Sequence, residues 1–253
     1  TSYNEYTKDL GKCNKTCIAD KVVLMRSVEQ INNLKEHRSP PIQFVDILDN
    51  NTIQKLIDFH NTNEKIEKNT GPIISYVKEG EGIIDDILYI LRLKFGDFKV
   101  RTAHYFDVSK PHIIHNDDDF ALPNSYKAFT IPLEVRAKTN KAKLVFFDQY
   151  YYDGPSKFVN KDNITDAPAY YNQFVTSYEK VLETNNKVLD PEHRKLLSHL
   201  KDEWLEGLSV QKYFPWTIGS IIAFDSLQLH CASNFLDTGA TSKLGLSIFT
   251  TID

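Results

Sequence analysis

Apolar residues recur at helical spacing in two stretches of the first hundred residues. After the run 49–52 (Asp-Asn-Asn-Thr), which supplies good helix N-cap residues, apolar positions predict a helix over about 52–62. A second apolar stripe predicts a helix over about 83–95. The residues that form these two stripes are Ile53, Leu56, Ile57 and His60, and Ile84, Ile87, Leu88 and Leu91. Stripes of this kind usually pack against a core, so they predict supporting helices.

From about residue 98 the period of the pattern changes to two, which is typical of β-strands. Pro132 lies inside one such stretch and suggests an edge strand or a bulge, because proline cannot donate to a ladder. The stretches with this pattern are 98–108, 126–135, 143–148, 220–225, 228–232 and 242–251. Many short strands separated by turn signals predict a mainly β fold, a sandwich or a double-sheet jelly roll.

The strand pattern stops between about 150 and 209, and two helices are expected there, over about 168–183 and 191–206. Some sixty residues are too many for a plain loop in a compact domain. We therefore expect a helical insertion that serves as a lid, a substrate wall, a dimer contact or extra packing on one face. Overall the pattern predicts a single domain over 1–253, in which an N-terminal extension and supporting helices (1–97) precede the β core (98–253).

A candidate metal site follows the first core strand. In extended backbone, side chains two residues apart point to the same face, so His115 and Asp117 can present an imidazole nitrogen and a carboxylate oxygen to one ion. His230, in the strand 228–232, is the candidate for a third ligand. Two histidines and one carboxylate with coordination positions left open are the ligand set of non-haem Fe(II) oxygenases.

Composition and charge change this picture little. Of the 253 residues, 41% are hydrophobic and 25% are charged, which suits one ordinary globular domain. Thirty Lys and Arg against 34 Asp and Glu give a net charge of −4, so we expect no nucleic-acid partner. Neither a bilayer-spanning apolar run nor a signal-peptide segment is apparent, and we expect no membrane partner. The odd set Cys13, Cys17 and Cys231 argues against a disulfide framework, so we expect a reduced, cytoplasmic chain.

The constellation resembles the 2-oxoglutarate- and Fe(II)-dependent dioxygenases, in particular phytanoyl-CoA-dioxygenase and prolyl-hydroxylase-like members. The resemblance covers roughly 98–253 and rests on His115 and Asp117 after a strand, the run Trp216–Ser226 with its Phe-Asp-Ser ending, and His230 shortly afterwards. It implies a double-stranded β-helix core and Fe(II) held by these three side chains, with 2-oxoglutarate as co-substrate and O2 as oxidant. Because the carboxylate ligand is present, it also implies hydroxylation of a small molecule or an amino-acid side chain, rather than halogenation.

The same resemblance implies a cation on the last core strand that holds the distal carboxylate of 2-oxoglutarate. Lys243 stands where the family usually has Arg, 13 residues after His230, and Ser247 shares its face of the strand. The departure matters, since Arg offers a planar fork and Lys a compact point charge. Further candidates for contacts with this carboxylate are two hydroxyl residues, Tyr105 and Thr130, and a competing cation, Lys127.

Other polar residues close to these motifs have simpler expected roles. His112 should point away from His115 and be structural or support the site, and Asp118 should project away from its neighbour Asp117. Cys231 should also point away from the metal. Arg101 and Arg136 are candidates either for contact with an anionic substrate or for solvent exposure.

Alternative functions remain open at this point. A cupin-like enzyme would use the same three ligands without 2-oxoglutarate, and it needs no cation at Lys243. A non-catalytic jelly-roll binding domain would bind no divalent metal. Zinc hydrolysis would require a further general base, which we do not find. The substrate, a small molecule or a peptide, has no readable motif, and a homodimer through the helical insertion is a further option.

Overall fold

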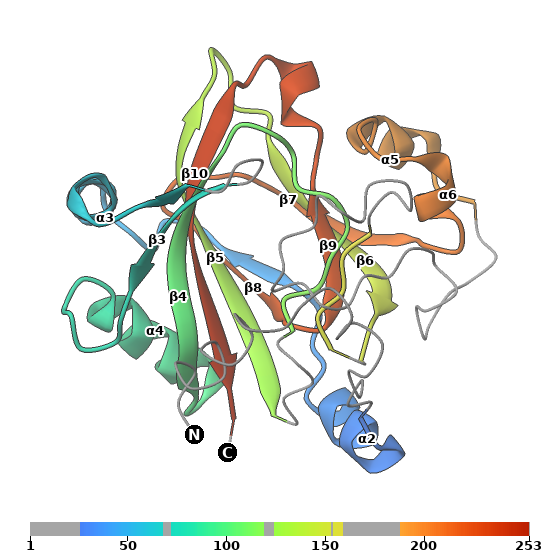
Figure 1. Cartoon of the computed structure of the whole chain (residues 1–253), viewed down its shortest axis with the longest axis horizontal. Helices are drawn as coiled ribbons and strands as arrows, with labels where there is room; N and C mark the ends of the chain where they lie inside the picture. Colours follow the sequence, from blue (N-terminus) through green and yellow to red (C-terminus); the bar gives the residue numbers. More distant parts are fainter. Residues whose placement is uncertain (1–25, 68–71, 119–123, 153, 159–187, 253) are drawn as a thin grey trace, which may run out of the picture.

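The computed structural model describes residues 26–67, 72–118, 124–152, 154–158 and 188–252, and it shows two antiparallel β-sheets that face each other with helices on their outer sides (Figure 1). The helices of these ranges are α2 (Val28–Glu36), α3 (Asn50–Thr62), α4 (Asp85–Phe95), α5 (Pro191–Leu196) and α6 (Asp202–Leu205). The strands are β1 (Ile42–Phe44), β2 (Ile66–Glu67), β3 (Ile73–Val77), β4 (Lys99–Val108), β5 (Ser125–Arg136), β6 (Lys143–Tyr150), β7 (Val210–Pro215), β8 (Ile221–Asp225), β9 (Gln228–Ala232) and β10 (Ser242–Thr251).

From β4 onward the chain passes back and forth between the two sheets. The larger sheet has the order β1-β8-β5-β10-β4-β3-β2, and the smaller sheet has the order β7-β6-β9. The segment after β4 runs beside β9 through the antiparallel bridge between His115 and His230, so it extends the edge of the smaller sheet. The alternation of β4, this segment and β5 to β10 between two sheets confirms the mainly β jelly roll that the strand pattern predicts.

Two helices cover the outer face of the larger sheet, as Figure 1 shows for α3 and α4. The side chain of Asp49 accepts a 2.7 Å hydrogen bond from the backbone N–H of Thr52 and so caps α3, as the run 49–52 predicts. The apolar stripes of both helices pack against alternate residues of the strands, among them Phe129 and Leu246. Both predicted helices are therefore confirmed, within two residues at each end.

The side chains of the opposite face of the larger sheet point into the space between the sheets. Ala128, Ile222 and Phe249 from the larger sheet pack there against Leu144 and Phe146 from the smaller one. Both faces of β5 are buried over most of its length. Pro132 lies in this central strand beside a shift in its register with β10, so the predicted bulge is confirmed and the predicted edge position is wrong.

The described part of the insertion packs on the outer face of the smaller sheet. Apolar residues of 197–208, including Leu197, Trp204 and Leu208, contact Val145 and Cys231 there. The single helix predicted over 191–206 is wrong, because α5 ends at Leu196 and α6 begins at Asp202. The intervening turn is stabilised by the Arg194 guanidinium, which donates to the carbonyls of Leu197 and Leu200. The helix expected over about 168–183 lies outside the described residues.

Helix α2 and four short strands were not expected from the pattern. The α2 signal is a capping box, in which Ser27 and Gln30 exchange side-chain and backbone hydrogen bonds. Strands β1, β2 and β3 are short pieces towards the ends of the larger sheet, and β7 is an edge strand with only one buried residue, Phe214. Such strands carry little apolar alternation, so a period-two search overlooks them.

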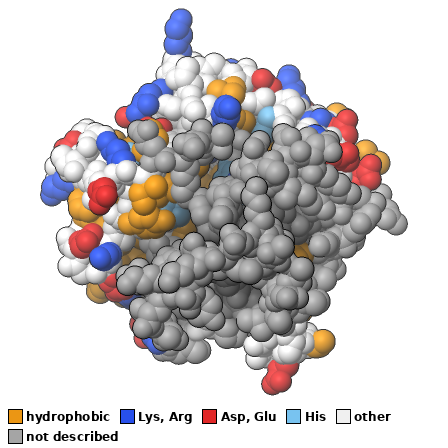
Figure 2. Space-filling model, viewed as in Figure 1, with side chains coloured by type: hydrophobic (Ala, Val, Ile, Leu, Met, Phe, Trp, Pro, Cys, Tyr) orange, Lys and Arg blue, Asp and Glu red, His pale blue; other side chains and the backbone are white. Residues whose placement is uncertain are grey.

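The surface of the described chain mixes charges of both signs. On the face seen in Figure 2, Lys and Arg side chains lie among Asp and Glu side chains around a group of hydrophobic side chains at the left. None of the helices in the described ranges has the combination of length and apolar character that crossing a bilayer requires.

A buried histidine makes the stability of this fold depend on pH. His60 of α3 is 4% exposed, and its Nδ1 lies 2.7 Å from the Ser75 hydroxyl. Burial lowers the pKa of His60 below its ordinary value. The unfolded chain therefore binds a proton below about pH 6.5 that the folded protein does not, and the stability that the neutral ring contributes is lost as pH falls.

We predict that the free energy of unfolding in urea decreases between pH 7.5 and pH 5.5, with each such histidine contributing at most about 1.4 kcal/mol per pH unit. His60→Gln should show a smaller decrease over the same interval than the native protein. Equal pH slopes for the two proteins would contradict this account.

Candidate metal centre

His115 and His230 are brought together by a reciprocal pair of backbone hydrogen bonds. The N–H of His115 donates to the carbonyl of His230 at 3.0 Å, and the N–H of His230 donates back at 2.9 Å. Residues paired in this way lie directly opposite each other and point their side chains to the same face. The two imidazole rings accordingly lie with their centroids 4.3 Å apart, on the inner side of the smaller sheet.

Asp117 joins this pair from the same segment. Its N–H donates to the carbonyl of Ser226 at 2.7 Å, in the turn between β8 and β9, so the Phe-Asp-Ser motif fixes its backbone. One carboxylate oxygen lies 3.6 Å from Nε2 of His115, and the other lies 3.3 Å from Nε2 of His230. His230 is buried, whereas His115 and Asp117 keep 13% and 15% of their side-chain exposure, which leaves one side of the cluster accessible.

Both histidines present the same nitrogen to the cluster. Nδ1 of His115 lies 2.8 Å from the carbonyl of Ile113, and Nδ1 of His230 lies 2.9 Å from the carbonyl of Gln228. A carbonyl only accepts, so each Nδ1 carries a proton, and the Nε2 of each ring faces the cluster. Burial, together with the neighbouring His112 and His230, holds the pKa of His115 well below its ordinary value, so this ring is neutral near pH 7.

The carboxyl of Asp117 is held in its charged form. Burial alone would raise its pKa, but the neighbouring His230, His115 and Arg101 lower it overall. Arg101 also donates from its guanidinium to the backbone carbonyl of Asp117 at 3.0 Å. Arg101 is thus half-buried beside the cluster, whereas Arg136 is exposed and pairs with Glu134 and Asp107.

The three side chains fit a divalent metal. Their ligand atoms, two imidazole nitrogens and a carboxylate oxygen, all lie within 4.8 Å of one another. Two such atoms bound to one ion at about 2.0–2.2 Å lie at most roughly 4.4 Å apart, and both measured N–O separations are below this limit. The backbone carbonyls that hold the two Nδ1 atoms supply the outer hydrogen bonds that metal-bound histidines almost always have. The expected ligand set therefore assembles, and its donors suit Fe(II) with open positions.

His112 does not point away from His115, contrary to expectation. Its ring centroid lies 4.1 Å from that of His115. The segment 109–114 is not a regular strand, so the alternation of side chains does not apply to it. Asp118 does project away from the cluster, as expected, and pairs with Arg26. Cys231 also points outward, into the apolar layer beneath α5 and α6.

Lys243, Ser247 and Thr130 lie on the inner face of the larger sheet. Ser247 is paired directly with Thr130, and Gly245 separates it from Lys243. A side chain at 245 would collide with the rings of Phe106 and Trp216, which lie close to this glycine. Lys243 is 4% exposed, and its Nζ lies 3.9 Å from the centre of the Trp216 ring.

Two of the expected cofactor contacts are wrong. Tyr105 is paired with Leu246, which lies on the outer face of the larger sheet, and its ring stacks on His60 beneath α3. Its hydroxyl therefore lies on the opposite side of the sheet from the metal cluster. The amine of Lys127 is also not directed to the inner face, because it forms a buried ion pair with Asp225 and donates to the hydroxyl of Ser39. The alternation of side chains along β4 indicates the correct face for Tyr105. Its neighbours His104 and Phe106 face inward, so Tyr105 faces outward.

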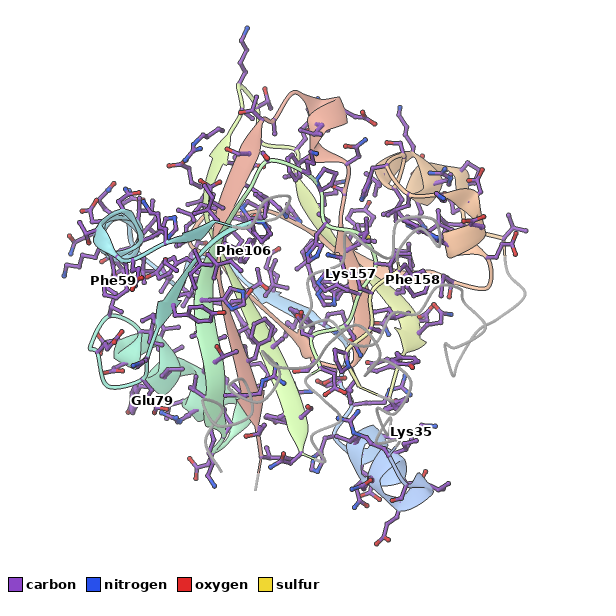
Figure 3. The ribbon with its side chains drawn as sticks, in the orientation of Figure 1. Lys35, Phe59, Glu79, Phe106, Lys157 and Phe158 are labelled. Atoms are coloured by element: carbon purple, nitrogen blue, oxygen red, sulfur yellow. The ribbon has the colours of Figure 1, made fainter. Side chains whose placement is uncertain are left out.

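Several residues near the cluster were missed from the sequence. Arg26 holds Asp118, and Asn116 is itself held by the backbone carbonyl of Tyr151. Lys157 pairs with His115 through its backbone, and Figure 3 places it across the space between the sheets from Phe106. His199, in the turn between α5 and α6, is a half-buried histidine, and burial lowers its pKa to about 4. No local motif marks these positions, because their partners are far away in the sequence.

The fold resembles solved structures, although no protein-family model matches the sequence and no curated protein matches it either. One similar structure is a 2OG-Fe(II) oxygenase-family oxidoreductase from Burkholderia pseudomallei (11% identity, 95% of this chain and 92% of that chain, TM-score 0.45). Another is a prolyl-4-hydroxylase from Pseudomonas putida (12% identity, 89% and 98%, TM-score 0.45). A third is HygX from Streptomyces hygroscopicus with nickel and 2-oxoglutarate bound (7% identity, 89% and 87%, TM-score 0.48). At such distances the chemistry of this site has to follow from its own residues.

We predict that Asp117→Ala lowers the affinity of the protein for Fe(II) or Mn(II) by more than about 100-fold, since the loss of a partner outside the ligand set already costs 10- to 100-fold. Anaerobic titration calorimetry measures the effect. Asp107→Ala, which removes a carboxylate from the neighbouring strand end, serves as the matched control and should bind metal like the native protein. Equal affinities for the two variants would remove Asp117 from the ligand set.

Proposed function

We propose that the protein is a 2-oxoglutarate-dependent Fe(II) oxygenase that hydroxylates a small molecule or a peptide side chain. The observation that carries this proposal is the pre-arranged cluster of His115, Asp117 and His230, whose ligand atoms converge with one side accessible. When bound, Fe(II) and 2-oxoglutarate supply the oxidising power to insert one oxygen atom of O2 into a C–H bond, with succinate and CO2 as co-products. The motifs that resemble this dioxygenase family contain the same three residues.

The residues of the chain contribute orientation and charge. Backbone carbonyls accept from the Nδ1–H of both imidazoles and so orient the Nε2 of each ring towards the cluster. The backbone of Asp117 is fixed by Ser226, and its carboxyl stays ionised. Aromatic side chains around His230, namely Phe146 and Phe224, keep water from that side of the cluster.

Lys243 is the proposed contact for the distal carboxylate of 2-oxoglutarate. Burial lowers the pKa of its amine to about 7, and among the described residues no carboxylate forms an ion pair with it. A buried amine without an anionic partner is costly even beside the ring of Trp216, and a bound carboxylate would compensate that cost. Ser247 and Thr130, side by side on the same inner face, are the proposed hydroxyl contacts.

The buried cation favours this function over the alternatives. A cupin-like enzyme without 2-oxoglutarate has no use for an inward-facing Lys243, whereas a dicarboxylate co-substrate does. Zinc hydrolysis would need a general base beside the metal. Asp118, the nearest further carboxylate along the chain, is held away by Arg26. A non-catalytic binding domain would not require two histidines held in the metal-binding tautomer.

We predict that the native protein releases succinate from 2-oxoglutarate with Fe(II) under air, and that Lys243→Met raises the KM for 2-oxoglutarate about 10- to 100-fold. A hydrogen bond to a charged group contributes about 1.5–3 kcal/mol, which corresponds to this range. Lys212→Met, at an exposed lysine of β7, is the control and should keep the native KM. Metal binding without any succinate release would favour the cupin-like alternative instead, and an unchanged KM in Lys243→Met would reject the anchor.

We also predict a pH dependence that separates Lys243 from an arginine in the same place. In the free protein the Lys243 amine is charged below its pKa of about 7 and loses its charge above it. The affinity for 2-oxoglutarate should therefore fall above pH 7, by up to about tenfold per pH unit. A guanidinium stays charged over this range, so Lys243→Arg should abolish the dependence. Parallel KM–pH profiles for the native protein and Lys243→Arg would contradict the assignment.

A further inference from the structure

The residue after the carboxylate ligand takes part in a buried ion pair with the N-terminal segment. Both oxygens of Asp118 accept from the guanidinium of Arg26, at 2.6 and 2.9 Å. One of them also accepts from the hydroxyl of Ser125 at 2.6 Å. The side chains of Arg26 and Asp118 are 1% and 0% exposed. With three donors on two oxygens, the carboxylate of Asp118 is fully engaged and turned away from the metal cluster.

The residue before the ligand is fixed as well. The side-chain amide of Asn116 donates to the carbonyls of Tyr151 and Gly154, at 3.0 and 3.1 Å, and its oxygen accepts from the N–H of Ser156 at 2.8 Å. Asp117 therefore lies between two neighbours whose side chains are held by separate parts of the protein. Its own side chain is left to face the two histidines.

Arg26 connects these two anchors. Besides Asp118, its guanidinium donates to the carbonyl of Tyr152, in the same 151–154 stretch that holds Asn116. Helix α2, which follows Arg26, packs Leu34 against Tyr150, Tyr152 and Leu227. The planar fork of an arginine fixes a carboxylate in direction as well as distance. A residue 91 positions before Asp117 in the sequence thus determines how the ligand segment is held.

The chemical consequence concerns which carboxylate meets the ion. Asp117 and Asp118 are consecutive, and each offers the kind of oxygen that a divalent metal binds. Without its partner, the carboxylate of Asp118 would be a buried, unpaired charge next to a metal centre. It would then move towards the ion, or pull the backbone of Asp117 with it.

We propose that Arg26 is a positioning residue of the metal centre. It holds the carboxylate of Asp118 away from the ion, so that Asp117, and not Asp118, supplies the carboxylate ligand. The inference rests on the proposed function only as far as the triad binds a divalent metal. It does not depend on 2-oxoglutarate or on the substrate.

The test is a titration of the metal-free full-length chain with Co(II), followed by visible absorption, at a temperature at which circular dichroism shows every variant folded. Arg26→Gln should weaken Co(II) binding about 10- to 100-fold and change the ligand-field spectrum of the bound ion. Leu91→Ala is the matched control, because it destabilises the fold from the far side of the larger sheet. It should keep the native affinity and spectrum.

A second variant separates positioning from a general loss of structure. Adding Asp118→Asn to Arg26→Gln removes the competing carboxylate, so the double variant should regain the native spectrum and most of the affinity. The inference would be overturned if Arg26→Gln had the same Co(II) affinity and spectrum as Leu91→Ala. It would also be overturned if the folded double variant bound Co(II) as weakly as Arg26→Gln. A native protein that binds no Co(II) would overturn the proposed function together with it.

Discussion

The site depends on one backbone pairing, between His115 and His230. These residues are separated by 115 positions, and they meet because the segment after β4 adds itself to the edge of the smaller sheet. Two reciprocal hydrogen bonds set their register, and a slip of one residue would turn one imidazole to the other face. The jelly roll therefore does more than bury apolar side chains, because its closure determines whether three ligand atoms converge.

Around this pairing, burial sets the charges of the interior. It keeps His115 neutral and lowers the pKa of Lys243, while His230 and Arg101 keep Asp117 ionised. A neutral His115 and an anionic Asp117 are the states that a divalent ion requires. The buried amine of Lys243 would gain an ion-pair partner when a carboxylate binds. The same burial would penalise any ionised group without a partner. That explains why Asp118, beside the cluster, is held by Arg26 and Ser125.

Much of this arrangement could be predicted from the sequence, and the failures have physical causes. Long strands with two buried faces and strong helix stripes are local patterns, so β4, β5, α3 and α4 were expected nearly as they occur. The metal triad was expected because H-x-D in extended chain places both side chains on one face, and because His230 follows the Phe-Asp-Ser run. Tyr105 was assigned to the wrong face of β4, although the alternation of side chains along the strand already contradicted that assignment. His112 lies against His115, contrary to expectation, because its segment is not a regular strand. Arg26 could not be foreseen, since a buried ion pair 92 residues apart has no local signature.

Diffraction from crystals grown anaerobically with Fe(II), recorded at the iron absorption edge, would locate the bound iron. We predict one anomalous peak between the two sheets, bonded to Nε2 of His115, Nε2 of His230 and a carboxylate oxygen of Asp117, with both Nδ1 atoms still held by backbone carbonyls. An iron peak bonded to other residues, or fully loaded crystals with no peak at this cluster, would contradict this prediction.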